Sequence, residues 1–473
     1  MTRRTFFKLS TLASAAAVAA PAASAAPALK LGIISDIHVD DAQDKDALYF
    51  RQALELFRDQ HVDGVILSGD MANLGRMEQL QCVADVWYGV FPDDRLPDGS
   101  HVEKLFVYGN HDAAKVANFE ERAKKLHGED WQKHMISLNP AAAWKQCFRE
   151  EWAPIYAKTV RGYVFIGCHW GHEGKLDAYL TENADKLGLR GPKPFFYAQH
   201  PHPKDTVNSA HGAYSWGHDN GKSTAALAKF PNAVAFSGHS HYPLTHDTTI
   251  WQGAFTSVGA SSTSYAGFLN GRDDGEWSGA KPEPVPVAPR LDIDCRQCLV
   301  LSVFADRMTF ARHDLVQKAA LGPDWICPLP ACVDAASRPY DFAASEARAK
   351  VPQFAPGAKV STEKRKGKNR VGAEGEILAV KVPAARSTGP TGRLIEYEVT
   401  VENLMWGFTR IHTQKRMMAK GHVYAEETVI KEDECLFLME ELPRRTPIRF
   451  KVTPLNCFGQ GGNPVYSAEM TLT

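Results

Sequence analysis

Five short motifs rich in Asp, Asn and His occur in order along the first half of the chain. Each comes directly after an apolar run that is typical of a buried strand. The motifs are Asp36-Ile-His38, Gly69-Asp70-Met-Ala-Asn73, Gly109-Asn110-His111-Asp112, Gln199-His200-Pro-His202 and Gly238-His239-Ser-His241. One such motif arises easily by chance, but an ordered set of five at five strand ends does not. The set therefore indicates one site built from several loops.

The residue types in these motifs suit a pair of divalent cations that activate water on a phosphate. Such a site needs a bridging carboxylate and oxygen or nitrogen donors around two cations about 3.5 to 4 Å apart. Two carboxylates, one amide carbonyl and four imidazoles are available, from Asp36, Asp70, Asn110, His38, His200, His239 and His241. Two carboxylates leave a pair of dications with net positive charge, which attracts a phosphate dianion. The set contains no thiolate, which argues against a structural zinc cluster.

The apolar pattern also predicts the elements that must position these motifs. Strands are expected at 31–35, 65–67, 105–108, 163–168, 195–198, 233–237, 251–258, 299–304 and 308–312. Amphipathic helices are expected at 47–57, 77–87, 176–187 and 223–229. This alternation predicts an α/β core of two sheets packed face to face with helices outside. Because loops beyond strand carboxyl ends are where such sheets place ligands, the five motifs should converge.

The five motifs are those of the calcineurin-like metallophosphoesterases, which residues 30–315 resemble. The resemblance implies a four-layer α-β-β-α sandwich with two divalent metal ions. It implies that Asp36, His38 and His241 bind the first metal, that Asn110, His200 and His239 bind the second, and that Asp70 bridges both. A metal-bridging hydroxide would then attack the phosphorus of a phosphomonoester or a phosphodiester. This donor set accepts manganese, iron or zinc.

His111 lies beside a predicted ligand without being one. The resemblance implies that it stabilises the phosphoryl oxygens or protonates the leaving alkoxide. In the phosphoprotein phosphatase branch an Asp often orients this histidine from the position that Asn73 occupies here. Asp112 is a substitute to consider, although neighbouring side chains usually point apart. An amide raises the pKa of an imidazole less than a carboxylate does, so a neutral His111 is favoured.

A loop rich in Gly, Ser and Asn follows the fourth motif and carries candidate substrate contacts. The candidates for stacking on a base or sugar of the substrate are His202, His211, Tyr214 and Trp216. The alternative is a solvated loop with scattered histidines. His169 and His172 flank Trp170 at another strand end and are further candidates for lining the pocket.

The first residues of the chain resemble a twin-arginine export signal. Arg3-Arg4, two Phe and Lys8 precede an Ala-rich run, and Ala23-Ser24-Ala25 offers a cleavage site. Residues 1–25 are therefore set apart from the fold, and a periplasmic or extracellular location is expected. An uncleaved anchor is the alternative, although Pro21 interrupts the run. No other stretch approaches the roughly 18 apolar residues of a spanning helix, so no transmembrane segment is expected in the mature chain.

Composition narrows the classes of partner. The 473 residues are 44% hydrophobic, which is enough for a large core and more than one domain. Lys and Arg number 54 against 55 Asp and Glu, so no overall field selects nucleic acid, and a small phosphoester is the expected partner. Among the nine cysteines, Cys295 and Cys298 are expected to be buried thiols, and Cys327 and Cys332 are the better disulfide candidate.

The amino-acid composition and the pattern of apolar residues change after residue 330. We assign 29–330 to the catalytic domain, with an inserted cap at 113–155, and 331–356 to a linker. Expected strands at 377–382, 395–401, 423–429 and 448–454 predict an all-β sandwich over 357–473. The segment 449–459 resembles a strand and turn of fibronectin type III modules, and the basic run 364–368 is expected to be a solvated edge. An alternative function is a catalytically weak scaffold whose sandwich binds a glycan or a cell-surface partner.

Overall fold

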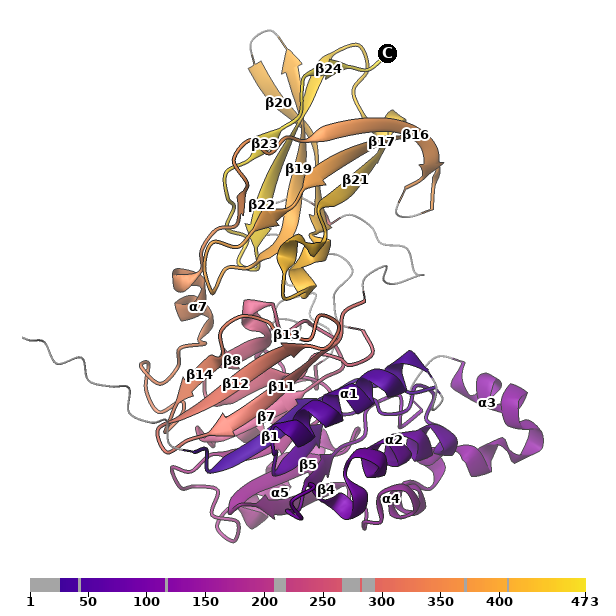
Figure 1. Ribbon diagram of the computed structural model, residues 1–473, viewed down its shortest axis with the longest axis vertical. Coiled ribbons are helices and arrows are strands. Elements are labelled where there is room, and N and C mark those ends of the chain that lie inside the picture. Colours follow the sequence, from indigo (N-terminus) through magenta and orange to yellow (C-terminus); the bar gives the residue numbers. More distant parts are fainter. Residues whose placement is uncertain are drawn as a thin grey trace, which may run out of the picture.

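The computed structural model describes residues 26–40, 44–114, 118–207, 218–265, 281–282, 294–369, 372–405 and 408–473. These residues form an α/β region, followed by a region that is nearly all β-sheet, with helix α7 (Phe342–Arg348) on the connection between them (Figure 1). The predicted signal sequence, together with His211, Tyr214 and Trp216, lies outside the described residues. No helix in the described part of the chain is long and apolar enough to cross a membrane.

The first sheet of the α/β region has the order β13-β12-β11-β1-β2-β3, with β14 paired to β12. Its parallel strands are β1 (Leu29–Ile34), β2 (Gly64–Leu67) and β3 (Glu103–Phe106), with β3 at the edge. An antiparallel side continues the sheet through β11 (Gln297–Val303), β12 (Arg307–Asp314), β13 (Ala319–Ala320) and β14 (Trp325–Pro328). Helices α1 (Lys45–Asp59) and α2 (Met77–Val90) connect the parallel strands.

The second sheet has the order β4-β5-β6-β7-β9-β8. Its strands are β4 (Ile155–Val160), β5 (Tyr163–Cys168), β6 (Phe195–Ala198), β7 (Ala233–Ser237), β8 (Ile250–Gln252) and β9 (Thr256–Gly259). Strands β5, β6, β7 and β9 run parallel. Helices α5 (Leu176–Asn183) and α6 (Lys222–Leu227) pack on this sheet through a buried cluster that includes Leu180 and Leu227.

Three apolar clusters hold the α/β region in four layers. One cluster joins the facing sides of the sheets, with Ile33 and Leu299 from the first and Phe236 from the second. A second cluster lies between the first sheet and helices α1 and α2, and a third lies between the second sheet and helices α5 and α6. Strands buried on both sides must be apolar on both faces, which explains their continuous apolar runs. The predicted α-β-β-α arrangement is therefore confirmed.

Residues 118–148, which fall in the segment predicted as a cap, form helices beside α2 (Figure 1). They are α3 (Phe119–His127), the 3₁₀ segments Gly128–His134 and Ile136–Leu138, and α4 (Pro140–Phe148). Helix α4 packs against α2, where the Tyr88 hydroxyl donates to the Phe148 carbonyl at 2.9 Å. The Ile136 amide donates to the Gly75 carbonyl at 3.0 Å, so this segment is tied to the loop that precedes α2.

The C-terminal region contains a three-stranded and a six-stranded sheet around an apolar core. The smaller sheet consists of β16 (Ser361–Lys368), β17 (Glu374–Pro383) and β21 (Glu432–Leu438). The larger contains β10 (Lys281–Pro282), β20 (Phe408–Met418), β19 (Leu394–Met405), β22 (Pro447–Asn456), β23 (Val465–Tyr466) and β24 (Met470–Thr471). A short pair joins β15 (Gln353–Phe354) to β18 (Ala385–Arg386). The basic run 364–368 lies on β16, where its side chains are exposed as expected.

Three sequence expectations were wrong, one in the C-terminal region and two earlier in the chain. Residues 420–429 form 3₁₀ turns instead of a strand, because Val423 is buried against the α/β region, where its carbonyl accepts from Gln297 Nε2 at 2.7 Å. The single strand expected at 251–258 is a hairpin of β8 and β9 that turns at Gly253. Cys327 and Cys332 form no disulfide, nor does any other of the nine cysteines, all of which are described.

Candidate metal centre

The predicted ligands lie just beyond the carboxyl ends of five parallel strands. They follow β1, β2 and β3 of the first sheet and β6 and β7 of the second, in the order Asp36, His38, Asp70, Asn110, His200, His239 and His241. All are buried except His239, which is half-buried. Because the two sheets pack face to face, loops from both meet at one edge of the sandwich.

The backbone at five of these ligands is in the left-handed region. The φ angles are 51° at Asp36, 53° at His38, 52° at Asp70, 68° at His239 and 55° at His241. Such a conformation costs a non-glycine residue on the order of 1 to 3 kcal/mol and persists only where the surroundings hold it. The Asp70 carbonyl accepts from the amides of Ile37 and His38 at 2.9 and 3.0 Å, so the first two loops hold each other.

Two glycines allow the ligand loops to approach one another. A Cβ atom on Gly109 would lie 2.0 Å from Asp70 Oδ1. A Cβ atom on Gly238 would lie 1.9 Å from Ser35 Oγ and 2.2 Å from Asp36 Oδ2. Both contacts are far shorter than real Cβ contacts, so these positions accept no larger residue without moving a ligand.

Asp36, His38 and His241 form the first group of donors. His241 Nε2 lies 3.0 Å from Asp36 Oδ1 and 3.2 Å from His38 Nε2. The Tyr265 carbonyl accepts from His241 Nδ1 at 2.8 Å, which turns Nε2 toward the group. A carbonyl on the far nitrogen is the usual support of a metal-binding imidazole.

Asp70, His200 and His239 form the second group. His200 Nε2 lies 3.1 Å from Asp70 Oδ2 but is a buried atom without a hydrogen bond, as is Asn110 Oδ1. The Ser68 carbonyl accepts from His200 Nδ1 at 2.7 Å. An unsatisfied buried acceptor such as Asn110 Oδ1 is costly, and a cation would satisfy it and would replace the proton that His200 Nε2 holds beside Asp70. The donor set therefore fits the divalent metals that the family resemblance implies.

Asp70 lies between the two groups. Its Oδ2 atom is 3.1 Å from His200 Nε2 in the second group and 3.7 Å from His38 Nε2 in the first. Its other oxygen, Oδ1, accepts from the His111 backbone amide at 2.9 Å. A carboxylate that faces both donor groups is placed to bridge two cations.

Charge within the centre is balanced by imidazoles. Burial alone would raise the pKa of Asp36, yet His241 and His200 hold it well below its usual range. Burial alone would lower the pKa of His200, yet Asp70 and Asp36 raise it to about 9. Binding of cations would therefore release protons from this group, as is general for metal sites.

His111 is oriented by a backbone carbonyl and not by a carboxylate. Its Nδ1 donates to the carbonyl oxygen of Asn73 at 2.7 Å, and its Nε2 lies 3.9 Å from Asp70 Oδ2. The Asn73 side chain instead donates to Asp40 at 2.9 Å. Burial lowers the pKa of His111, against the opposing effect of Asp70, which agrees with the expected neutral ring.

Asp112 does not take over the orienting role considered for it. Its carboxylate accepts from three backbone amides, those of Gly109 at 2.9 Å, Met71 at 3.2 Å and Ala72 at 2.8 Å. The neighbouring side chains of His111 and Asp112 point apart because Asp112 is turned into the protein. Asp112 thus supports the metal centre by joining the second and third ligand loops.

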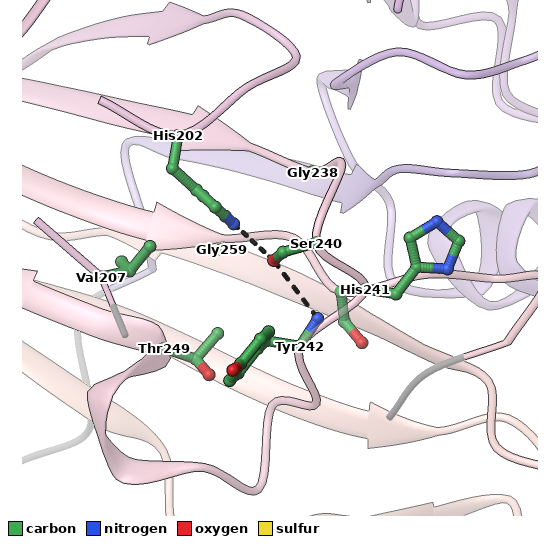
Figure 2. A pocket seen from close by; sticks show the side chains of 9 residues that line it. His202, Val207, Gly238, Ser240, His241, Tyr242, Thr249 and Gly259 are labelled. Atoms are coloured by element: carbon green, nitrogen blue, oxygen red, sulfur yellow. Dashed lines mark hydrogen bonds between the residues drawn. The ribbon is translucent and has the colours of Figure 1, made fainter. Parts of the chain in front are cut away.

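His202 is buried beside the fifth ligand loop, where it lines a small pocket together with Ser240 and His241. It is 2% exposed, and its two ring nitrogens lie 2.5 and 2.6 Å from the hydroxyls of Ser237 and Ser240. Figure 2 shows the His202 ring facing Ser240, while the His241 ring points away from it. Burial lowers the pKa of His202 to about 3, so it is a neutral support of the loop. The substrate role expected for His202 stays a prediction.

Two aromatic residues at the centre were missed as site residues. Trp170 follows β5, and its ring centroid is 5.6 Å from that of His239 and 5.9 Å from that of His200. Tyr265 follows β9, with its ring centroid 4.1 Å from that of His241. Their place after parallel strands of the second sheet is the signal that could have found them. The flanking His169 is buried and accepts from the Tyr108 amide, so it does not line a pocket.

The close approach at Gly109 yields a test of this geometry. Gly109→Ala should displace Asp70 and weaken metal binding about 10- to 100-fold, the range for a lost outer contact of a metal ligand. Isothermal titration of the metal-stripped protein with Mn²⁺ would measure the change. Gly367→Ala is the control, because a Cβ atom there meets no atom within 4 Å. Equal affinities in the two variants would contradict the geometry.

The chain is similar to a known protein family over part of its length. The model of the calcineurin-like phosphoesterase family matches residues 29–243. No curated protein matches the sequence at a significant level. Some solved structures are similar to parts of the chain at low sequence identity.

A dimetal phosphatase from Danio rerio is 12% identical, with a TM-score of 0.35, over 63% of this chain and 98% of that one. GAP50, the anchor in the inner membrane complex of Plasmodium, is 13% identical, with a TM-score of 0.34, over 64% of this chain and 88% of that one. The zinc complex of Vps29 from Entamoeba histolytica is 10% identical, with a TM-score of 0.29, over 63% and 99%. These scores are too low to support an argument about function.

The family match covers the strands, the loops and the five motifs that form the centre. The ligands that the resemblance implies are the same residues that the fold brings together from both sheets. Residues 29–243 are therefore similar to the calcineurin-like phosphoesterase family, whose model matches them.

Proposed function

We propose that this protein is an exported metal-dependent phosphohydrolase that cleaves a small phosphomonoester or phosphodiester at the centre around Asp70. The observation that carries the proposal is the pair of three-donor groups, of which the second includes Asp70, whose carboxylate also faces the first. The buried Asn110 Oδ1 atom forms no hydrogen bond. The family match over residues 29–243 supports the same class of reaction.

Each part of the site has a role in this reaction. When bound, two divalent cations would supply Lewis acidity and an activated water for attack on phosphorus. The ligand loops hold the donors in fixed positions, and Trp170 and Tyr265 pack beside the histidines of the two groups. His111 Nε2 lies 3.9 Å from Asp70 Oδ2, and the Asn73 carbonyl holds the Nδ1 proton, so the ring can donate to the leaving oxygen only after it has taken up a second proton at Nε2.

The glycan-binding alternative gains no support from the described residues of the C-terminal region. The relation of that region to fibronectin type III modules stays a prediction, since the family match ends at residue 243. The domain boundaries that we assigned from sequence remain part of the proposal.

Removal of one ligand tests whether metal binding and hydrolysis depend on the same residues. His241→Ala should lower the metal content and reduce hydrolysis of p-nitrophenyl phosphate and its bis ester at least about 100-fold, because a donor of the first group is lost. Metal analysis and steady-state kinetics would be measured on the same preparation. His61→Ala serves as the control, since the His61 side chain is 65% exposed. Activity that survives in His241→Ala would refute the proposal.

The role of His111 can be tested by varying the leaving group. His111→Asn should slow the hydrolysis of an alkyl phosphate about 10²- to 10⁴-fold, the range for general acid catalysis. The loss with p-nitrophenyl phosphate should be clearly smaller, because p-nitrophenolate leaves without a proton. Asn73→Ala, which keeps the carbonyl that orients His111, should retain the parent ratio of the two rates. Equal losses on both substrates would assign His111 to charge stabilisation alone.

Export is proposed from the first 25 residues of the sequence. Replacement of both Arg3 and Arg4 by Lys should hold the protein in the cytoplasm as the longer precursor, because the arginine pair is the recognised feature of the signal. Immunoblots of cell fractions would show the change. Lys8→Ala keeps the pair and should still be exported. An unchanged distribution in the double variant would remove the twin-arginine assignment without affecting the enzyme proposal.

A further inference from the structure

A second group of metal-binding side chains lies outside the Asp70 centre. It forms where residues 118–138 meet the first turn of α2. Glu78 comes from α2, His127 ends α3, and His134 ends the 3₁₀ segment that follows. One carboxylate oxygen and one nitrogen from each imidazole lie within 4.8 Å of one another.

The spacing of these donors suits a small divalent cation. His127 Nε2 lies 2.9 Å from Glu78 Oε1, and His134 Nδ1 lies 3.6 Å from Glu78 Oε2. Zinc binds nitrogen and oxygen donors at about 2.0 to 2.1 Å in a tetrahedron, which separates neighbouring donors by about 3.3 Å. The two observed distances lie on either side of that value.

Two of the donor atoms are buried and form no hydrogen bond. They are His127 Nε2 and Glu78 Oε2. His127 Nε2 and Glu78 Oε1 are therefore close together but are not aligned for a hydrogen bond. Arg76 donates to Glu78 Oε1 at 3.2 Å, which holds the carboxylate in place, as outer contacts do for metal-binding carboxylates.

We propose that Glu78, His127 and His134 bind a divalent transition-metal ion of the zinc type, separate from the ions of the Asp70 centre. Two imidazoles and one carboxylate form a donor set that zinc accepts, with water in the fourth position. The two imidazole nitrogens favour such an ion over Mg²⁺ or Ca²⁺, which prefer oxygen ligands.

Binding requires a local change in the two rings. Their centroids are 3.9 Å apart and their planes differ by 7°, whereas an ion bound to both must lie near both planes. The rings must therefore open. The His134 side chain is 42% exposed, which gives it room to rotate, while His127 is 14% exposed and stays in place.

The ion would fasten the helical segment to the loop before α2. That loop also carries Asn73, whose carbonyl orients His111, and Gly75, whose carbonyl accepts from Ile136. The proposed site is thus joined through about five residues of backbone to a group of the Asp70 centre. Its function would be to hold the segment 118–138 against α2.

The test compares bound zinc in full-length protein. The parent, His134→Gln and His127→Gln would be stripped with chelator, reloaded with Zn²⁺, freed of excess metal and analysed by mass spectrometry. Each variant should contain about one zinc ion fewer per chain than the parent. The result is the difference in zinc content per chain between the parent and each variant. This difference does not depend on how many ions the Asp70 centre holds.

A matched control is available at another histidine. His101 lies 3.2 Å from Glu103 in an exposed pair, so His101→Gln removes a His–Glu contact without a third donor and should keep the parent zinc content. Circular dichroism would establish that each variant is folded, and Glu78→Gln provides a third loss variant. Equal zinc in the parent and the folded His127, His134 and Glu78 variants would overturn the proposal and leave the group as an ordinary ion pair.

Discussion

Two carboxylates buried side by side, Asp36 and Asp70, impose the main constraint on this structure. Each is about 1% exposed or less, and neither can hold its charge in a protein interior without compensation. His200 and His38 supply part of that compensation, since the pKa values of both imidazoles are raised against the effect of burial by the two carboxylates. Protons on the imidazoles thus compensate the carboxylate charges at positions where bound cations would compensate them more fully. The carboxylates, the imidazoles around them and the unsatisfied acceptors nearby are thus explained together by cation binding.

The fold is arranged so that this charge can be buried. Parallel strands from two sheets end at the same edge, and their loops cross there with little space between them. Gly109 and Gly238 permit contacts that a side chain would block, and Asp112 ties two loops together through backbone amides. Five ligands have positive φ, so part of the packing energy of the sandwich maintains strained loops. The strained loops lower the stability of the protein but keep the donor atoms in fixed positions.

Much of this arrangement could be predicted from the sequence. The apolar runs predicted most strands of both sheets, although not β4, β13 or β14, and the motifs that follow them indicated the donors of the centre, because both features depend on local pattern. Contacts made by backbone atoms were harder to predict. The backbone carbonyl of Asn73 orients His111, whereas the prediction from sequence concerned the Asn73 side chain.

Residues whose role depends on distant packing were also missed. His202 lies two residues after a ligand but is enclosed by Ser237 at the end of β7 and Ser240 in the loop that follows. Val423 has a strand-like sequence context but packs against the α/β region, so the residues around it form turns. Trp170 and Tyr265 belong to no motif and are brought to the centre only by the order of strands in the second sheet. In each case a long-range contact outweighed the local pattern.

The central claim is that Asp70 joins two cation sites. Anomalous X-ray diffraction from crystals of the manganese-loaded protein would test it most directly. The account predicts two anomalous peaks about 3.5 to 4 Å apart, one on each side of the Asp70 carboxylate and both within bonding distance of it. A single peak that Asp70 does not contact, or peaks only elsewhere in the molecule, would contradict it.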